Sequence, residues 1–289
     1  MPLSVVDQPD ALRKALDAER ATGRTIGLVP TMGYLHAGHT SLMRRAASEC
    51  HVAVATIFVN PLQFSPTEDL AGYPRDPEGD RTKAERVGID YLFAPSTRDM
   101  FPEPPLTSVT VGAISERLEG AFRGSHFAGV ATIVTKLLAL AGSCRAYFGE
   151  KDYQQLVIIR RLVADLSLPA RVVACPTVRE PDGLALSSRN AYLSPAERAA
   201  APTLFRALVA GRAAVEDRHA TDAADIRSAM DAVMASEPRF SVDYTAVADP
   251  NDLSAVTTVT GEARLLIAAR LGRARLIDNL AVKATPEVR

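Results

Sequence analysis

The sequence contains no tryptophan and only three cysteines among its 289 residues. Cys50, Cys144 and Cys175 are far apart, odd in number, and lie in or beside apolar segments. This pattern favours buried free thiols in a reducing compartment, and it excludes a small secreted scaffold held together by disulfides.

The sequence also lacks a strong charge of one sign and a long apolar run. The net charge is −1 and the pI is about 6.5, so no global field favours nucleic acid or an anionic membrane. The longest apolar stretch, 130–141, is interrupted by threonine and lysine and is too short to span a bilayer. The N-terminal segment lacks a basic region followed by an apolar core, so we expect no signal peptide. We expect a soluble, cytoplasmic protein that binds neither nucleic acid nor membrane.

Apolar residues make up 47% of the chain and charged residues 23%, which is the usual balance of a globular protein. The length leaves room for roughly two domains. Up to residue 180, short apolar runs alternate with segments of helical periodicity, which predicts an α/β fold with a Rossmann-like parallel sheet. The predicted strands are 26–29, 51–58, 89–93, 145–149 and 171–175. The piece 119–126 between two of them is expected to be a loop.

Beyond residue 180 predicted helices come first and strands follow, which favours a smaller α+β domain. Ser194 and Glu197 have the spacing of a capping box, with Pro195 at the first helical position, and we expect one long helix from there to about Asp217. A further helix is expected at 222–236, and strands at 242–248, 263–268 and 274–278. We therefore divide the chain into domains 1–184 and 185–289.

Two histidines lie in the turn between the strand 26–29 and the helix that follows it. Pro30 ends the strand, His36 and His39 flank Ala37 and Gly38, and apolar residues recur at helical spacing after them. The first N–H groups of a helix lack internal partners, so such a start is a natural anion site, with phosphate a common occupant. Gly38 lets a phosphate approach the backbone. The turn therefore favours a nucleotide site.

From the residues alone, other interpretations stay open. The histidine pair could bind zinc, although no third ligand stands at a suitable spacing, or could simply lie on the surface. Lys151 and Asp152 could be a solvated pair at a helix start, and Gln155 a surface residue of its helix. Ser187 and Ser188 could belong to a linker.

Several separated stretches of the sequence form recognisable motifs. They are VPTMGYLHAGH at 29–39, IFVNPLQF at 57–64, YPRD at 73–76, HFAGVATIVTKLL at 126–138, FGEKDYQQL at 148–156, LALSSRN at 184–190 and, near the C-terminus, ARLLIAARLGRARLIDN. Together these motifs resemble one family, the pantoate–β-alanine ligases (pantothenate synthetases) of the His-x-Gly-His nucleotidyltransferase superfamily. The resemblance runs from about Ile26 to the C-terminus and is weaker after residue 195. The FGEKDYQQL and IFVNPLQF motifs are highly specific for this family, unlike the histidine turn alone.

The resemblance implies ATP-dependent joining of (R)-pantoate to β-alanine through a pantoyl adenylate, giving pantothenate, AMP and pyrophosphate. It also implies Mg²⁺, a homodimer in the cytoplasm, and a C-terminal domain that closes over the site. Because the pantoate carboxylate attacks the α-phosphorus of ATP, fixed positive groups and N–H donors must face the charge that develops. In the family pattern these groups belong to His36, His39, Lys151, Ser187, Ser188 and Arg189, with His39 as a proton donor.

The same resemblance implies the contacts with each substrate. Gln63 and Gln155, helped by Asn60, are implied to bind pantoate, since an amide donates and accepts without adding charge. Recognition of ATP, much of it through the backbone, is implied for Met32, Gly33, Tyr34, Leu35, His36, Ala37, Gly38, His39, Gly149, Glu150, Lys151, Asp152, Val178, Leu186, Ser187, Ser188 and Arg189. Leu186 stands where the family usually has methionine, and its similar volume should preserve an adenine contact. No residue is expected to be a metal ligand.

Two other functions remain as alternatives. A nucleotidyltransferase with another acceptor, such as a phosphopantetheine or a nicotinamide nucleotide, would use the same histidine turn, but the loop from Asn60 to Gln63 suits a small polyol acid. A synthetase-derived RNA-binding module would need a basic surface, which a net charge of −1 does not favour.

Overall fold

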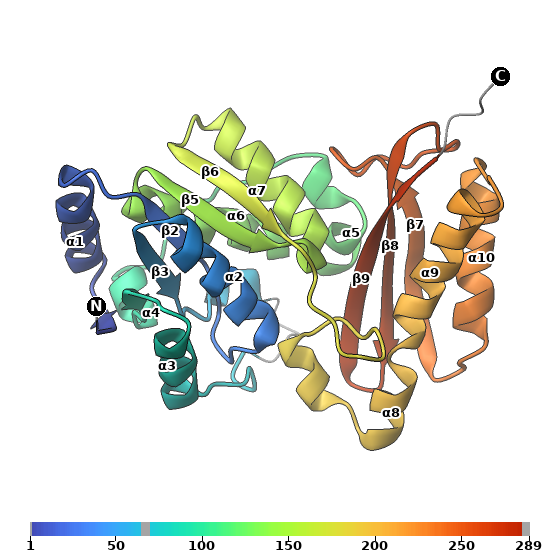
Figure 1. Cartoon of the computed structure of the whole chain (residues 1–289), viewed down its shortest axis with the longest axis horizontal. Helices are drawn as coiled ribbons and strands as arrows, with labels where there is room; N and C mark the ends of the chain where they lie inside the picture. Colours follow the sequence, from blue (N-terminus) through green and yellow to red (C-terminus); the bar gives the residue numbers. More distant parts are fainter. Residues whose placement is uncertain (1, 65–69, 285–289) are drawn as a thin grey trace. The chain divides into compact units, whose positions relative to one another are not determined.

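A parallel sheet of six strands organises the first part of the computed structural model, which describes residues 2–64 and 70–284 (Figure 1). The order is β1-β4-β3-β2-β5-β6, and each neighbouring pair is parallel. The bounds are β1 Ser4–Val6, β2 Ile26–Val29, β3 Val52–Thr56, β4 Tyr91–Phe93, β5 Cys144–Gly149 and β6 Ala170–Cys175. The Rossmann-like α/β fold predicted from the sequence is confirmed.

Strand β1 was not predicted from the sequence. Its three residues pair only with β4 at the edge of the sheet, and two of them are exposed, so they carry no apolar run. A strand of this kind is defined by its tertiary partner, which a local pattern does not contain.

Helices connect these strands. They are α1 Pro9–Ala21, α2 Ala37–Glu49, α3 Pro77–Arg86, α4 Thr97–Met100, α5 Glu119–Arg123, α6 His126–Ala141 and α7 Tyr153–Asp165, with 3-10 turns at Pro61–Gln63, Ile114–Glu116 and Glu150–Asp152. The expectation of a loop over 119–126 was wrong, because 119–123 form α5 and His126 opens α6. Five residues are too short to show helical periodicity in the sequence.

The chain leaves the adjacent strands β2 and β5 in opposite directions across the sheet. From β2 it passes through α2 to β3, and from β5 through α7 to β6. Right-handed crossovers then put α2 and α7 on opposite faces of the sheet. The carboxyl ends of β2 and β5 therefore form the topological switch point, where open parallel sheets bind their ligands.

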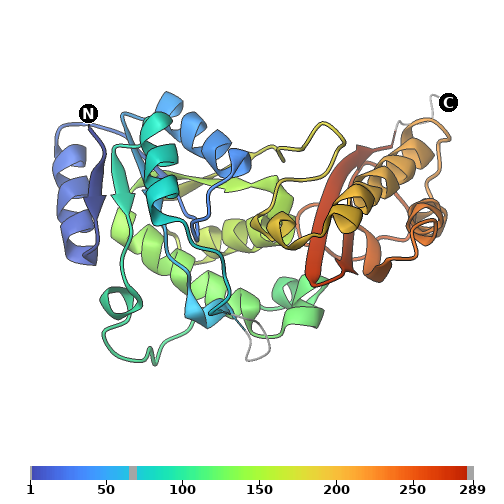
Figure 2. The same ribbon diagram turned by 90° about the horizontal axis from the view of Figure 1, so that it is seen from below.

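A separate antiparallel sheet, β7-β8-β9, organises the rest of the chain. Its strands are β7 Phe240–Ala248, β8 Glu262–Leu271 and β9 Ala274–Lys283, and its helices are α8 Pro195–Ala200, α9 Thr203–Glu216 and α10 Ala223–Ala235. Helix α9 lies along β9 and β8, and α10 packs beside α9 and against β7 (Figure 2). A core of its own includes Leu204, Leu208, Met230, Leu265 and Ile267. The predicted smaller α+β part is confirmed.

The predicted long helix from Ser194 to Asp217 is in fact two helices. The capping box is present, with Glu197 Oε2 accepting from the Ser194 N–H at 2.7 Å. The first helix ends at Ala200, and the second begins at Thr203, directly after Pro202. Proline lacks the N–H that would continue the helical ladder, so the break follows from the sequence and was overlooked.

By its internal contacts the chain divides into two compact units. The first comprises Met1–Glu116, Gly120–Glu150 and Gln154–Pro176, and the second comprises Arg117–Glu119, Lys151–Tyr153 and Thr177–Arg289. The main division thus falls between Pro176 and Thr177, whereas the sequence puts its boundary after residue 184. The functional domains 1–184 and 185–289 stay a prediction.

All three cysteines are free thiols. Cys144 and Cys175 are buried, while Cys50 is only half-buried, so the expectation of burial was wrong for that residue. Within the described ranges, no helix combines the length and the apolarity needed to cross a bilayer.

Candidate active site

The histidine turn lies at the carboxyl end of β2, on the switch point of the first unit. His36 is the N-cap of α2, and its Nδ1 accepts a hydrogen bond from the Gly38 N–H at 3.2 Å. His39, one turn into the helix, accepts from the His36 N–H through its own Nδ1 at 3.3 Å. The two rings lie 4.0 Å apart, centroid to centroid. The turn is therefore a capping box built from two imidazoles.

These hydrogen bonds select one form of each ring. A ring nitrogen that accepts from a backbone N–H carries no proton, so both neutral rings carry theirs on Nε2. In that form the donor atom of each ring is Nε2, and the rings stand beside the N–H groups at the start of α2. Donors of this kind suit a phosphate oxygen.

A buried carboxylate that the sequence analysis missed holds the turn. Asp80, on α3, accepts the Tyr34 N–H at 2.7 Å and the Leu35 N–H at 2.6 Å, and it is 1% exposed. Burial raises its pKa above the ordinary value, against the opposing effect of these two backbone hydrogen bonds. The backbone beside it is left-handed, with φ of +81° at Gly33 and +50° at Tyr34. Asp80 thus stabilises a conformation that is costly for a tyrosine. In the sequence, the one indication that Asp80 is buried is its spacing of four residues from the apolar Ala84, which puts both on one face of the helix.

The loop after β3 lies next to the histidine turn. Thr31 donates from Oγ1 to the Thr56 carbonyl at 2.6 Å, which ties the ends of β2 and β3 together. Asn60 Nδ2 donates to Gln63 Oε1 at 3.3 Å, and Gln63 Nε2 lies 2.7 Å from the Met32 sulfur. The structure thus brings Met32, Asn60 and Gln63, three of the predicted site residues, into contact.

Helix α6 fixes the position of that loop. Asn60 Nδ2 also donates to the Gly129 carbonyl at 3.0 Å, and His126 Nδ1 lies 2.9 Å from the Gln63 carbonyl. A side chain on Gly129 would overlap the Leu62 carbonyl and would come within 2.6 Å of the Gln63 nitrogen. His126 and Gly129 both belong to the HFAGVATIVTKLL motif. Because His126 contacts the backbone of the loop, its role in this motif is structural.

Further predicted residues of the first unit lie where β5 ends. Gly149 is the last residue of β5, Glu150 begins a 3-10 turn, and Gln155 is half-buried in the first turn of α7. Since β5 neighbours β2, this end of β5 is adjacent to the carboxyl end that carries the histidine turn. The joint role of Gln155 and Gln63 in binding pantoate stays a prediction.

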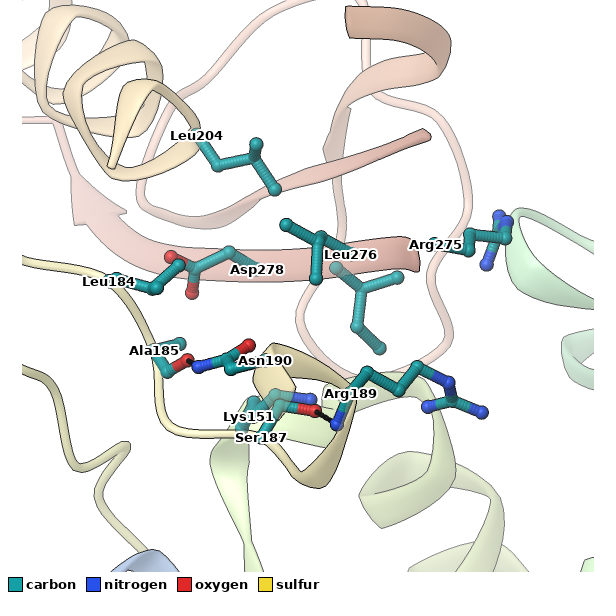
Figure 3. Close-up of a pocket in the computed structure, with 11 residues that line it drawn as sticks. Lys151, Leu184, Ala185, Ser187, Arg189, Asn190, Leu204, Arg275, Leu276 and Asp278 are labelled. Atoms are coloured by element: carbon teal, nitrogen blue, oxygen red, sulfur yellow. Dashed lines mark hydrogen bonds between the residues drawn. The ribbon is translucent and has the colours of Figure 1, made fainter. Parts of the chain in front are cut away.

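The remaining predicted residues belong to the second unit. Lys151, Ser187 and Arg189 line one hollow together with Asn190 and Asp278 (Figure 3). Lys151 Nζ lies 3.3 Å from the Asp152 carboxylate, and the Ser187 hydroxyl accepts from the Arg189 N–H at 3.3 Å. Ser188 begins the 3-10 turn Ser188–Tyr192. Three cations, Lys151, Arg189 and Arg275, line the hollow with one carboxylate, Asp278, that is itself paired with Arg179, and this excess of positive charge suits an anion.

A short hairpin leads into this hollow. Val178 accepts through its carbonyl from the Leu186 N–H at 3.0 Å, and Arg179 and Ala185 form an isolated antiparallel bridge. The contact of Val178 and Leu186 with ATP stays a prediction.

Metal binding by the protein alone has no support in the described ranges, since no group of three or more His, Cys, Asp or Glu side chains gathers there. Mg²⁺ typically keeps several waters and uses substrate phosphates with one or two carboxylates. A Mg²⁺ ion that arrives with the nucleotide would need no such group of side chains.

An open parallel sheet with an imidazole-capped helix start at its switch point defines the class of α/β nucleotide-binding proteins. The family model described as Pantoate-beta-alanine ligase matches residues 4–281. The chain belongs to this family, which confirms the resemblance found from the motifs.

Curated relatives agree over nearly the whole length. The chain is 51% identical over 270 residues to a pantothenate synthetase of Roseiflexus sp. (strain RS-1), with 92% of this chain and 96% of that protein covered. It is 48% identical over 280 residues to a pantothenate synthetase of Rhizobium johnstonii, with 97% and 92% covered.

Solved structures agree as well. A pantothenate synthetase of Thermus thermophilus has a TM-score of 0.91 at 48% identity, covering 96% of this chain and 98% of the other. A pantoate–β-alanine ligase of Francisella tularensis, described as complexed with β-γ ATP and β-alanine, has a TM-score of 0.79 at 31% identity, covering 96% and 97%.

Proposed function

We propose that this chain is the ligase that its family is named for, joining (R)-pantoate to β-alanine with ATP to give pantothenate, AMP and pyrophosphate. The family match across residues 4–281 carries the proposal, and the ATP and β-alanine described for the Francisella tularensis structure support both co-substrates. A nucleotidyltransferase with a different acceptor is not favoured.

The reaction is proposed to proceed through a pantoyl adenylate. The pantoate carboxylate attacks the α-phosphorus, pyrophosphate leaves, and the β-alanine amine then displaces AMP from the acyl carbon. His36 and His39, which carry Nε2–H, would donate to the phosphate as negative charge develops on it. Lys151, Ser187, Ser188 and Arg189 would hold the pyrophosphate side, where a compact ammonium and a planar guanidinium both suit phosphate.

Binding of the substrates is assigned to the predicted residues. Pantoate would be held by Gln63 and Gln155, with Asn60 supporting Gln63 through its amide. ATP would be held by the histidine turn, by 149–152, and by Val178 and 186–189. Mg²⁺ would accompany ATP as part of the substrate, neutralising phosphate charge.

We also propose a cytoplasmic homodimer. Both properties come from the family resemblance. A sedimentation mass equal to the single chain, 30.9 kDa, would contradict the dimer.

Pyrophosphate release tests the proposed function directly. With Mg·ATP and pantoate alone, we expect a burst of one pyrophosphate per site. Added β-alanine should convert the burst to turnover, with AMP and pantothenate formed in equal amounts. Folded protein that binds ATP but releases no pyrophosphate under either condition would overturn the assignment of pantoate as the acceptor. The acceptor would then be another small molecule.

A further inference from the structure

The C-terminal motif ends in Asp278 and Asn279, two polar residues that the proposed chemistry does not use. Both lie on β9 and both are buried, at 4% and 3% exposed. Asp278 also lines the hollow with Lys151, Ser187 and Arg189 (Figure 3). Buried polar groups next to a proposed anion site require an explanation, because burying them is costly unless they are paired.

Asp278 is held by an arginine from the hairpin that leads into the hollow. Arg179 donates to the two carboxylate oxygens through Nη1 at 2.5 Å and Nη2 at 2.8 Å. The same guanidinium donates to the Gly183 carbonyl at 3.0 Å and stacks on the Phe205 ring at 4.0 Å. Arg179 thereby fixes the hairpin to β9 and also ties the strand that carries it to the turn at Gly183.

The pairing also decides what Asp278 does. A lone carboxylate in this hollow would repel a phosphate, but the two-pronged ion pair with Arg179 cancels its charge. Asp278 is therefore suited to hold the backbone from Val178 to Arg189 in place, rather than to contact the nucleotide.

Asn279 fixes the backbone of Lys151, which lines the same hollow. Its Oδ1 accepts from Arg264 Nε at 2.7 Å, and its Nδ2 donates to the Lys151 carbonyl at 2.8 Å. Arg264 in turn stacks on the Tyr153 ring at 3.9 Å. The amide thus connects a buried cation on β8 to the backbone of a residue proposed to bind phosphate.

We propose that Asp278 and Asn279 are a positioning pair, which sets Lys151 against Ser187 and Arg189 so that the three can bind one phosphate chain. Two neighbouring residues of one strand fix two segments that are distant in sequence, one through Arg179 and one through the Lys151 carbonyl. The inference rests on the proposed function, since it assumes that these three residues bind ATP.

The variant Asn279→Asp separates positioning from general stability. An aspartate keeps an oxygen for Arg264, and even adds charge to that contact, but it presents a second oxygen to the Lys151 carbonyl where the amide donated. We expect pantoate-dependent pyrophosphate release to fall by about a hundredfold, as for a reacting group displaced by 1 Å. The affinity for pantoate, whose predicted contacts lie in the first unit, should stay near its wild-type value. The thermal midpoint should fall, because a buried carbonyl loses its donor, so the rate is measured at a temperature where the variant is fully folded.

Asp278→Glu provides the second arm, since it keeps the charge paired with Arg179 while moving the carboxylate by one methylene. It should lower the same rate, and Ala281→Ser, at an exposed position of β9, should not. Folded variants with wild-type adenylation rates would overturn the inference alone, and so would equal losses of adenylation and of pantoate affinity. A wild-type enzyme without pantoate-dependent pyrophosphate release would overturn the proposed function as well.

Discussion

Asp80 shows at the scale of one residue how much of the histidine turn depends on a single acceptor. Its carboxylate takes two backbone N–H groups, those of Tyr34 and Leu35. An asparagine in the same place offers one oxygen for two donors and points an NH₂ group at the other. A buried donor left without a partner costs about 1–3 kcal/mol, so the left-handed turn should relax.

We therefore expect Asp80→Asn to lower the rate of adenylate formation by about tenfold or more, since His36 and His39 follow the turn directly. Single-turnover pyrophosphate release measures this rate. Asp76→Asn is the matched control on the same helix, because asparagine caps a helix as well as aspartate does. A folded Asp80→Asn enzyme with the wild-type rate would show that the turn holds its conformation without this carboxylate.

Single residues were the least predictable part of the site. The resemblance supplied His36, His39 and Gln63, but the residues that hold them in place, Asp80 and Gly129, were not identified. Their partners are the backbone groups of distant segments, and Leu35 and Asp80 are 45 residues apart along the chain. Neither periodicity nor motif spacing contains such a contact.

At the scale of whole elements, Gly129 determines how closely α6 packs against the turn at Pro61–Gln63. The helix can come this close only because Gly129 has no side chain. In an isolated helix, glycine to alanine is favourable by about 1 kcal/mol. Here the added methyl group would overlap backbone atoms, which cannot rotate away. Overpacking of this kind typically costs about 1–3 kcal/mol, so the clash decides the sign.

Gly129→Ala should accordingly destabilise the protein and weaken pantoate binding, since the displaced turn carries Asn60 and Gln63. Titration calorimetry with pantoate measures the affinity, and thermal unfolding measures the stability. Gly112→Ala serves as the control, because its added methyl group would meet open space. Tighter pantoate binding or a raised thermal midpoint in Gly129→Ala would contradict the close approach.

Elements were predictable where their apolar pattern was long. The five strands predicted for the first sheet and the three for the second all exist, because each contains enough apolar residues in its sequence to show a pattern. The pattern was too short for β1 and for α5. At Pro202 the Ala-rich pattern continued across a break that proline chemistry alone would have revealed.

At the scale of the whole molecule, the parallel sheet and the separate antiparallel sheet followed from the order of strands and helices along the chain. Topology also put the histidine turn, the loop from Asn60 to Gln63 and the end of β5 on one edge of the first sheet. The assignment of Lys151 and Asp152 to the second unit could not be predicted, because it depends on tertiary contacts such as that between Asn279 and the Lys151 carbonyl.

The net charge supports a last prediction, which tests the RNA-binding alternative. A protein that neutralises several phosphates releases their counterions, so its affinity for a polyanion falls steeply with salt. With 33 basic and 34 acidic residues, this chain has no excess of positive charge to drive such binding. We expect it to pass a heparin column at about 50 mM salt, with a retention that hardly depends on salt, while a basic protein run beside it is retained. Retention that needs several hundred millimolar salt for release would reveal a local basic surface, and would revive a nucleic-acid partner alongside the ligase.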